Sequence, residues 1–252
     1  FFTCGDKRSN YLCISDDKGE NIIQKPLPCS VHGNEVGRAT GDRLIYKKGR
    51  LYFGSQTAGI IYSEDIGESW QSIDLYGEKN ISLIWTDSEG KLFITGCSGE
   101  ANSPDGVTRG HTLYCSTDGL KSFVPLTAPD PVKYENSSYY GFVPQRITSD
   151  SRYIYITFAS SGKVFYGGMG AYACDTGSLS GGKVYRYRIE NGVPVFDTDI
   201  TPEDDTPCGY SGICSNGKML LLSTVCRKNG GDMIYTSTDS GESWKIIMNG
   251  LE

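Results

Sequence analysis

The stretch that decides the fold is SEDIGESW, residues Ser63–Trp70, because its eight-residue pattern recurs along the chain. Three further copies are STDSGESW (237–244), STDGLKSF (116–123) and SDDKGENI (15–22). The shared template is Ser-x-Asp-x-Gly-x-x-Trp. The copy at 116–123 shifts its glycine and ends in Phe, and the copy at 15–22 ends in Ile. Repetition of one pattern along a chain indicates a repeat architecture.

The pattern is an Asp-box, and it predicts a tight turn between the two outer strands of a four-stranded sheet. Its aspartate can accept hydrogen bonds from N–H groups of the turn, and its glycine allows a positive φ. Its aromatic residue is expected to fill the space between neighbouring sheets. We therefore predict a structural role, and neither catalysis nor metal binding, for the box aspartates. These are Asp17, Asp65, Asp118 and Asp239.

The composition suits an all-β protein. The chain has 252 residues, which is enough for one large domain, and we predict a single domain over residues 1–252. It holds 32 Gly and 17 Tyr, a composition that favours short strands joined by turns. A net charge of −6 without a basic run argues against nucleic acid and anionic membranes as partners. No stretch reaches the ~18 apolar residues that span a bilayer.

The nine cysteines are widely spaced and form no CxxC motif, which argues against a zinc site. We expect no metal and no cofactor. The odd number leaves at least one free thiol, and Cys13 and Cys115 are expected to be small buried residues. Because the chain opens on Phe1-Phe2 without Met, we expect a segment of a longer or processed protein.

The repeats divide the chain into about five units of about 50 residues, each with the pattern of four short strands. Such units predict the blades of a β-propeller with Asp-box (BNR) repeats. About five blades either close a small propeller or form part of a larger, seven-bladed one. The fourth unit has RIENGVPVF (188–196) in place of a box. We expect strands 50–55, 91–96, 153–158 and 218–224 to be buried on both faces. We expect strands 184–189 and 233–238 to alternate between more buried and less buried residues.

Three long insertions follow the second strand of units three, four and five. They are residues 97–111, 160–182 and 225–232. Because long loops at one end of a repeat scaffold usually carry function, we expect the binding surface there.

The segment HGNEVGRATGDRL (32–44) carries a more specific signal than the boxes. It resembles the N-terminal propeller of glycoside hydrolase family 74, the xyloglucan-cleaving endoglucanases. That family has a Gly-Asn-x-x-Gly-Arg-x-x-Gly-Glu-Arg-Leu segment before a strand, Tyr-Phe-Gly and an Asp-box. Asp42 replaces the glutamate. Residues 153–158, 181–187 and 199–202 are similar to later family segments in the same order, so the likeness spans nearly the whole chain.

The resemblance implies a secreted or cell-surface glycoside hydrolase of the endo-β-glucanase or xyloglucanase type, acting on plant polysaccharide. Family members use two aspartates across a cleft between two seven-bladed propellers. One lies in an Arg-Thr-Asp-x-Gly-Gly motif and the other in the second propeller, and this chain shows neither. The implied partners are therefore a polysaccharide or oligosaccharide and a second propeller domain or subunit. Whether the chain is itself an enzyme stays open.

Glycoside hydrolysis needs two carboxyl groups that face one bond, ~5 Å or ~6.5–9.5 Å apart. The catalytic candidates are Asp42, Glu100, Asp105 and Asp175. Sugar binding needs aromatic faces, and amide or guanidinium groups for the hydroxyls. The candidate substrate-binding residues are Asn34 and Arg38, by resemblance, and Tyr140, Phe165, Tyr166 and Tyr172, in or near the Gly-rich insertion.

A second hypothesis is a non-catalytic Asp-box propeller that binds glycan or protein, and the absent aspartate motif favours it for this chain in isolation. A sialidase is disfavoured, because no arginine lies in an early Arg-Ile-Pro strand of the kind that grips a carboxylate.

Overall fold

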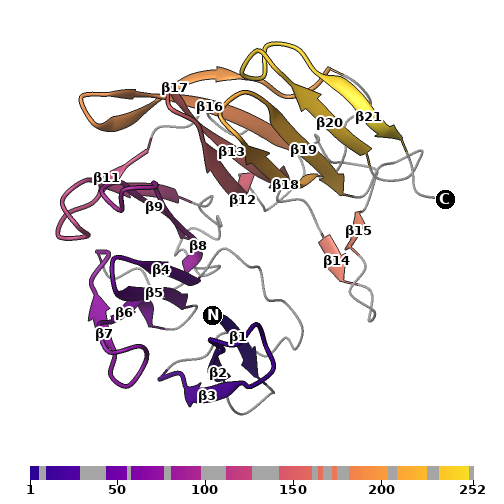
Figure 1. Cartoon of the computed structure of the whole chain (residues 1–252). Coiled ribbons are helices and arrows are strands. Elements are labelled where there is room, and N and C mark those ends of the chain that lie inside the picture. Colours follow the sequence, from indigo (N-terminus) through magenta and orange to yellow (C-terminus); the bar gives the residue numbers. More distant parts are fainter. Residues whose placement is uncertain are drawn as a thin grey trace. The chain divides into compact units, whose positions relative to one another are not determined.

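The computed structural model describes residues 1–5, 10–28, 44–55, 58–76, 81–97, 112–126, 142–160, 164–166, 172–174, 182–203, 209–225 and 233–249. Every regular element in these ranges is a strand, so the predicted all-β class is confirmed. The chain folds as two compact units (Figure 1). Unit 1 is Phe1–Ser98 with Tyr114–Val124, and unit 2 is Gly99–Leu113 with Pro125–Glu252. A single domain over residues 1–252 stays a prediction.

Unit 1 holds three sheets, and in each sheet every strand is hydrogen-bonded to the next one along the chain. Sheet 1 contains β1 (Phe2–Gly5), β2 (Asn10–Ile14) and β3 (Ile23–Pro26). Sheet 2 contains β4 (Leu44–Lys47), β5 (Arg50–Ser55), β6 (Gly59–Ser63) and β7 (Gln71–Ile73). Sheet 3 contains β8 (Ile81–Thr86), β9 (Phe93–Cys97), β10 (Thr112–Ser116) and β11 (Val124–Pro125). The first residues of β10 and the last of β11 cross the unit boundary.

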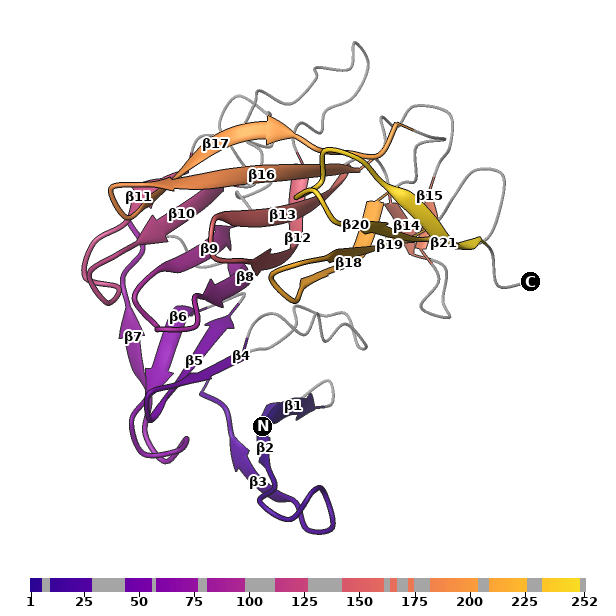
Figure 2. The ribbon, with the colours of Figure 1, turned by 45° about the horizontal axis from the view of Figure 1, so that its top comes forward.

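Unit 2 holds two four-stranded sheets and a hairpin, drawn from a second direction in Figure 2. Sheet 4 contains β12 (Phe142–Ser149), β13 (Tyr153–Ser160), β16 (Lys183–Glu190) and β17 (Val193–Asp199). The hairpin is β14 (Val164–Tyr166) with β15 (Tyr172–Cys174). Sheet 5 contains β18 (Gly209–Ser215), β19 (Leu220–Val225), β20 (Met233–Ser237) and β21 (Lys245–Asn249). The predicted four-stranded sheets are therefore confirmed, while the blade number of a closed propeller stays a prediction.

The core of unit 1 lies between consecutive sheets. Because side chains alternate along a strand, β5 sends Leu51 and Phe53 toward Leu12 of sheet 1, and Tyr52 toward Phe93 of sheet 3. Strand β5 is thus buried on both faces, as predicted, and the predicted burial of β9 and β13 is also confirmed. Cys13 and Cys115 are small buried residues, as expected.

The core of unit 2 lies between sheets 4 and 5, where Tyr155 and Val184 pack with Tyr210, Leu222 and Tyr235. Strand β20 alternates between buried and half-buried residues, as predicted. The strand at 218–224 does not follow its prediction. Its Leu221 and Ser223 are only half-buried, because within unit 2 sheet 5 is covered on one face.

The prediction for residues 184–189 was also wrong. Val184, Tyr185, Arg186 and Tyr187 are all buried, and the strand becomes exposed only at Arg188. Tyr185 and Tyr187 pack edge-on against Phe196 of β17, with ring centroids 5.5 and 5.9 Å apart. The opposite face meets sheet 5, so this strand is covered on both sides.

The predicted insertions lie between the second and third strands of sheets 3, 4 and 5, as expected. In sheet 4 the third and fourth strands are joined by Asn191 and Gly192, with φ of 52° and 83°, in place of a box. This pair forms a short left-handed turn, which is why a box is not needed to close the hairpin.

Candidate functional site

The four box turns share one arrangement of hydrogen bonds. In the turn after β6, the Ser63 hydroxyl donates to Asp65 Oδ1 (2.7 Å) and accepts from the Gly67 N–H (2.7 Å). Asp65 Oδ1 also accepts from the Ser69 N–H at 2.9 Å. The same three bonds recur in the turns that begin at Ser15, Ser116 and Ser237. Each aspartate therefore closes its own turn.

The residue at the seventh position of the pattern also binds the aspartate, a contact that was not predicted from the sequence. Asp65 Oδ2 accepts from the Ser69 hydroxyl at 2.5 Å. Ser122 and Ser243 do the same at 2.6 and 2.5 Å, and the Asn21 amide replaces them in the first box at 2.5 Å. The signal was available, because this position is Ser in three copies and Asn in the fourth.

The shifted glycine of the third box has a structural explanation. In every box the fourth and fifth residues both have positive φ, for example Ile66 at 55° and Gly67 at 82°. In the third box Gly119 takes the fourth place, at 75°, and Leu120 the fifth, at 69°. The Leu120 side chain is buried against the cluster around Tyr52. Burial of this leucine offsets the backbone strain of a non-glycine residue at positive φ.

The hydrogen bonds keep the box carboxyl groups ionised. The backbone N–H of Asn21 is the main reason that the pKa of Asp17 falls to about 2. The Ser243 hydroxyl is the main reason that the pKa of Asp239 also falls to about 2. The hydroxyls of the corresponding serines likewise lower the pKa of Asp65 and Asp118. A carboxyl group with so low a pKa holds no proton near neutral pH, so it is unsuited to act as a general acid.

The box carboxylates also lie away from the insertions. In sheet 5 the insertion joins β19 to β20, and the box joins β20 to β21. Both pairs of strands are antiparallel, so these two connections lie at opposite ends of the sheet. A ligand bound by the insertion would be one strand length from Asp239.

The structure brings two of the predicted aromatic residues together. Tyr166 of β14 is the cross-strand partner of Tyr172 of β15, and Phe165 is opposite Ala173. This hairpin belongs to the insertion between β13 and β16. The remaining predicted binding and catalytic residues lie outside the described residues. They are Asn34, Arg38, Asp42, Glu100, Asp105, Tyr140 and Asp175.

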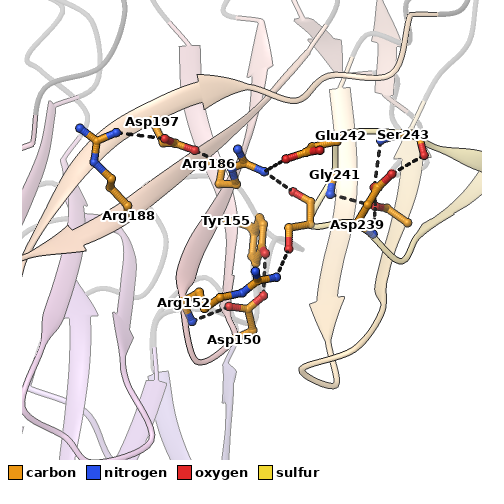
Figure 3. A network of polar contacts seen from close by, with 12 residues as sticks. Asp150, Arg152, Tyr155, Arg186, Arg188, Asp197, Asp239, Gly241, Glu242 and Ser243 are labelled. Atoms are coloured by element: carbon orange, nitrogen blue, oxygen red, sulfur yellow. Dashed lines mark hydrogen bonds and ion pairs between the residues drawn. The ribbon is translucent and has the colours of Figure 1, made fainter.

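A polar network centred on Arg186 lies where sheet 4 meets the box of sheet 5 (Figure 3). Arg186 Nε donates to Asp197 Oδ2 at 2.6 Å, and its Nη1 donates to the Ser240 carbonyl at 3.0 Å. The guanidinium carbon lies 4.5 Å from the ring centre of Tyr153. Because Arg186 is only 8% exposed, this charge is held almost entirely by protein groups.

The turn between β12 and β13 extends the network. Asp150 accepts from the Arg152 N–H (2.7 Å) and the Tyr155 hydroxyl (2.6 Å). The pKa of the Tyr155 hydroxyl is raised, mainly because the side chain is buried. Arg152 Nη2 donates to the Ser240 hydroxyl oxygen at 2.8 Å. The arginines and Asp150 thus bond to protein groups of sheets 4 and 5, which fits a role in joining the two sheets.

No group of three His, Cys, Asp or Glu side chains arranged to hold a metal ion occurs in the described ranges. Those ranges also contain no helix long and apolar enough to cross a membrane.

Comparisons with known proteins identify relatives along almost the whole chain, although no family model matches. The chain is 26% identical to an oligoxyloglucan-reducing end-specific xyloglucanase of Emericella nidulans, over 93% of this chain and 30% of that protein. It is 22% identical to a xyloglucanase of a Paenibacillus species, over 96% of this chain and 24% of that protein. The chain thus spans about a third or less of the length of these relatives.

Solved structures show the same likeness. The family 74 xyloglucanase of Xanthomonas campestris superposes with a TM-score of 0.66 at 22% identity, over 95% of this chain and 34% of that chain. The family 74 enzyme of Niastella koreensis superposes with a TM-score of 0.67 at 22% identity, over 96% of this chain and 34% of that chain. The chain shares the fold of these proteins, and the predicted resemblance to glycoside hydrolase family 74 is confirmed.

Proposed function

We propose, from the resemblance to glycoside hydrolase family 74, that this chain is part of an enzyme that cleaves xyloglucan. The observation that carries the proposal is the match to xyloglucanases over more than nine-tenths of the chain. The substrate would be a plant polysaccharide, which is too large to enter a cell intact. Secretion or display at the cell surface therefore belongs to the same proposal.

Within that enzyme, the chain would supply binding loops and a wall of the cleft. The β14–β15 hairpin supports this role, because it places Tyr166 and Tyr172 at paired positions. Tyrosine rings stack on the apolar faces of sugar rings, and their hydroxyls can bond to sugar hydroxyls. The insertion that contains the hairpin connects β13 to β16, the two central strands of sheet 4.

We propose that the catalytic carboxyl groups are not those of the box aspartates. The box carboxylate oxygens already accept hydrogen bonds within their turns, and the pKa values of these groups are low. The candidates in this chain are Asp42, Glu100, Asp105 and Asp175. A second propeller domain or subunit would contribute a carboxylate across the cleft, because hydrolysis needs two carboxyl groups on either side of one bond.

Affinity electrophoresis of the full chain in gels that contain xyloglucan tests the binding role. We expect xyloglucan to retard the chain more than a mixed-linkage β-glucan does. Tyr166→Ala and Tyr172→Ala should remove most of the retardation. Tyr46→Ala is the matched control, because Tyr46 is a 49%-exposed tyrosine on β4 of unit 1. Equal mobility in all gels would contradict a glycan-binding role.

Mass-spectrometric analysis of products after incubation with xyloglucan tests catalysis. Xyloglucan oligosaccharides would show that both carboxyl groups lie in this chain, and alanine substitution of the four candidates would then identify them. Retardation without product would assign binding to this chain and at least one carboxylate to another part of the enzyme.

A further inference from the structure

At its open end the β18–β19 hairpin of sheet 5 stops one residue short of two cysteines. Strand β18 begins at Gly209 and β19 ends at Val225, and these two residues are cross-strand partners. Cys208 directly precedes Gly209 in the sequence, and Cys226 directly follows Val225. Both cysteines lie outside the described residues, and the strands beside them carry the inference. Because these strands are antiparallel, the next pair in their register is Cys208 with Cys226.

Packing fixes the register at this end of the hairpin. Tyr210 and Thr224 form the pair next to Gly209 and Val225, and their side chains are only 1% and 2% exposed. Thr224 Oγ1 accepts a hydrogen bond from the Met233 N–H at 2.8 Å, which joins the end of β19 to β20. A slip of one residue would turn buried side chains away from the core, so the register is strongly specified.

Directly opposite residues of an antiparallel pair have the spacing that a disulfide needs. Their Cα atoms lie about 4.5 or 5.5 Å apart, depending on whether the pair is hydrogen-bonded. A disulfide joins Cα atoms that are about 4.4–6.8 Å apart. Because side chains alternate along a strand, positions 208 and 226 fall on the same face of the sheet as Tyr210 and Thr224. The register thus meets both the distance and the direction that a bond requires.

Other cysteines do not compete for this pairing within the strands. Three of them have residues of other types as cross-strand neighbours, which are Phe2 and Gln24 for Cys13, Val164 for Cys174 and Leu221 for Cys214. Cys214 also belongs to β18, but it lies six residues from Cys208, which is roughly 20 Å along an extended strand. That separation is too long for a disulfide.

This end of the hairpin is also the place where a covalent bond would reinforce the sheet. Strand β18 is the terminal strand of sheet 5, so β19 is its one hydrogen-bonded neighbour in the described sheet. The register shifts between Tyr210 and Gly212, which leaves two residue pairs between this bulge and the open end. A bond beyond these two pairs would prevent the end of β18 from separating from β19.

We propose that Cys208 and Cys226 form a disulfide that closes the β18–β19 hairpin at the start of the insertion 225–232. The two thiols lose two protons and two electrons as the S–S bond forms. A protein disulfide of an oxidising compartment accepts them by exchange and is reduced to two thiols. The proposal rests on secretion, which belongs to the proposed function, because disulfides persist in oxidising compartments. The bond fixes the point where the insertion leaves the sheet.

Peptide mapping of the full chain, produced by secretion and never reduced, tests the bond. Free thiols are first blocked with N-ethylmaleimide, and the chain is then cut with trypsin and chymotrypsin. Chymotrypsin cuts between Cys208 and Cys214, so the two thiols are told apart. We expect peptide 197–210 to stay linked to peptide 223–227 until a reductant is added. Maleimide on both Cys208 and Cys226, or linkage of either to a different cysteine, would overturn the proposal.

Thermal unfolding tests the effect of the bond on stability. Cys208→Ser should lower the Tm by about 5–10 °C, because the bond restricts the unfolded chain. The double variant Cys208→Ser, Cys226→Ser should lower it no further, because loss of one thiol already removes the bond. Cys214→Ser is the matched control, since it removes an exposed free thiol of β18, and it should leave the Tm unchanged. Equal Tm values for all these variants and the wild type would overturn the stabilising role.

The disulfide and the glycan-binding role can fail separately. Retardation by xyloglucan without a link between Cys208 and Cys226 would overturn the disulfide alone. The link without retardation would contradict glycan binding alone. Peptide mapping uses the wild-type chain, so it decides the proposal even where a serine variant does not fold.

Discussion

Arg186 Nε donates to Asp197 Oδ2 over 2.6 Å, and the two side chains are only 9% and 17% exposed. The pair joins β16 to β17, and Arg186 Nη1 donates a hydrogen bond to the Ser240 carbonyl in the box of sheet 5. The Arg186 guanidinium thus neutralises a carboxylate within sheet 4 and donates a hydrogen bond to the backbone of sheet 5. Removal of either partner leaves the other charge poorly solvated.

Arg186→Met should destabilise the protein by about 3 kcal/mol, because Asp197 loses its buried partner and the Ser240 carbonyl loses its donor. Arg188→Met is the matched control. Arg188 also contacts Asp197, at 3.2 Å, but is half-exposed, so its loss should cost less than about 1 kcal/mol. Urea unfolding measures both free energies. Equal losses for the two variants would mean that burial of the Arg186 pair has no special effect on stability.

Gly67→Ala should destabilise far more than Gly19→Ala. Both glycines have strongly positive φ, +82° and +94°, so both substitutions carry a backbone penalty of about 1 kcal/mol. Only the Cβ at residue 67 would lie 2.6 Å from Leu12 Cδ2, which adds about 1–3 kcal/mol of overpacking. Thermal and urea unfolding of the two variants give the difference. Comparable destabilisation would show that strain at the turn, and not the contact between sheets, determines the need for glycine.

The box aspartates make the free energy of unfolding depend on pH in the acid range. Folding lowers the pKa of Asp17 and Asp239 from 3.8 to about 2. A lowered pKa stabilises the folded state fully above the unfolded value, and this contribution is lost as the pH falls from about 4 toward 2. The free energy of unfolding should therefore fall steeply across this window. Asp239→Asn should be less stable than wild type at pH 6, and the gap should narrow toward pH 2. A constant gap would rule out ionisation of Asp239 as the cause.

Much of the fold could be predicted because boxes and turns carry local signals. The φ values of the fourth and fifth box residues are set by the turn itself, and the Ser-x-Asp motif in the sequence indicates this turn. The pair Asn216-Gly217 similarly marks the β18–β19 hairpin, and Gly217 has a φ of 82°. Such features need no knowledge of distant residues.

The inter-sheet contacts could not be predicted in this way. Arg186 lies in VYRYRI, where arginine at every second place is typical of an exposed face. Its burial depends on Asp197, Ser240 and Tyr153, which lie 11, 54 and 33 positions away in the sequence. Among the candidate substrate-binding and catalytic residues, only Phe165, Tyr166 and Tyr172 lie in described strands. Their contribution to glycan binding stays a prediction.

The two box tryptophans should respond differently to loss of the indole N–H. Trp244 Nε1 donates to the Ile200 carbonyl at 2.7 Å, whereas Trp70 Nε1 is buried without an acceptor among the described residues. Both Trp→Phe substitutions remove similar apolar area. Trp244→Phe also leaves the Ile200 carbonyl without this donor, so it should cost about 1 kcal/mol more than Trp70→Phe, which removes an unsatisfied donor. Urea unfolding measures the difference. A cost for Trp70→Phe that equals that of Trp244→Phe would show that the Trp70 indole has an acceptor in solution, such as an ordered water molecule.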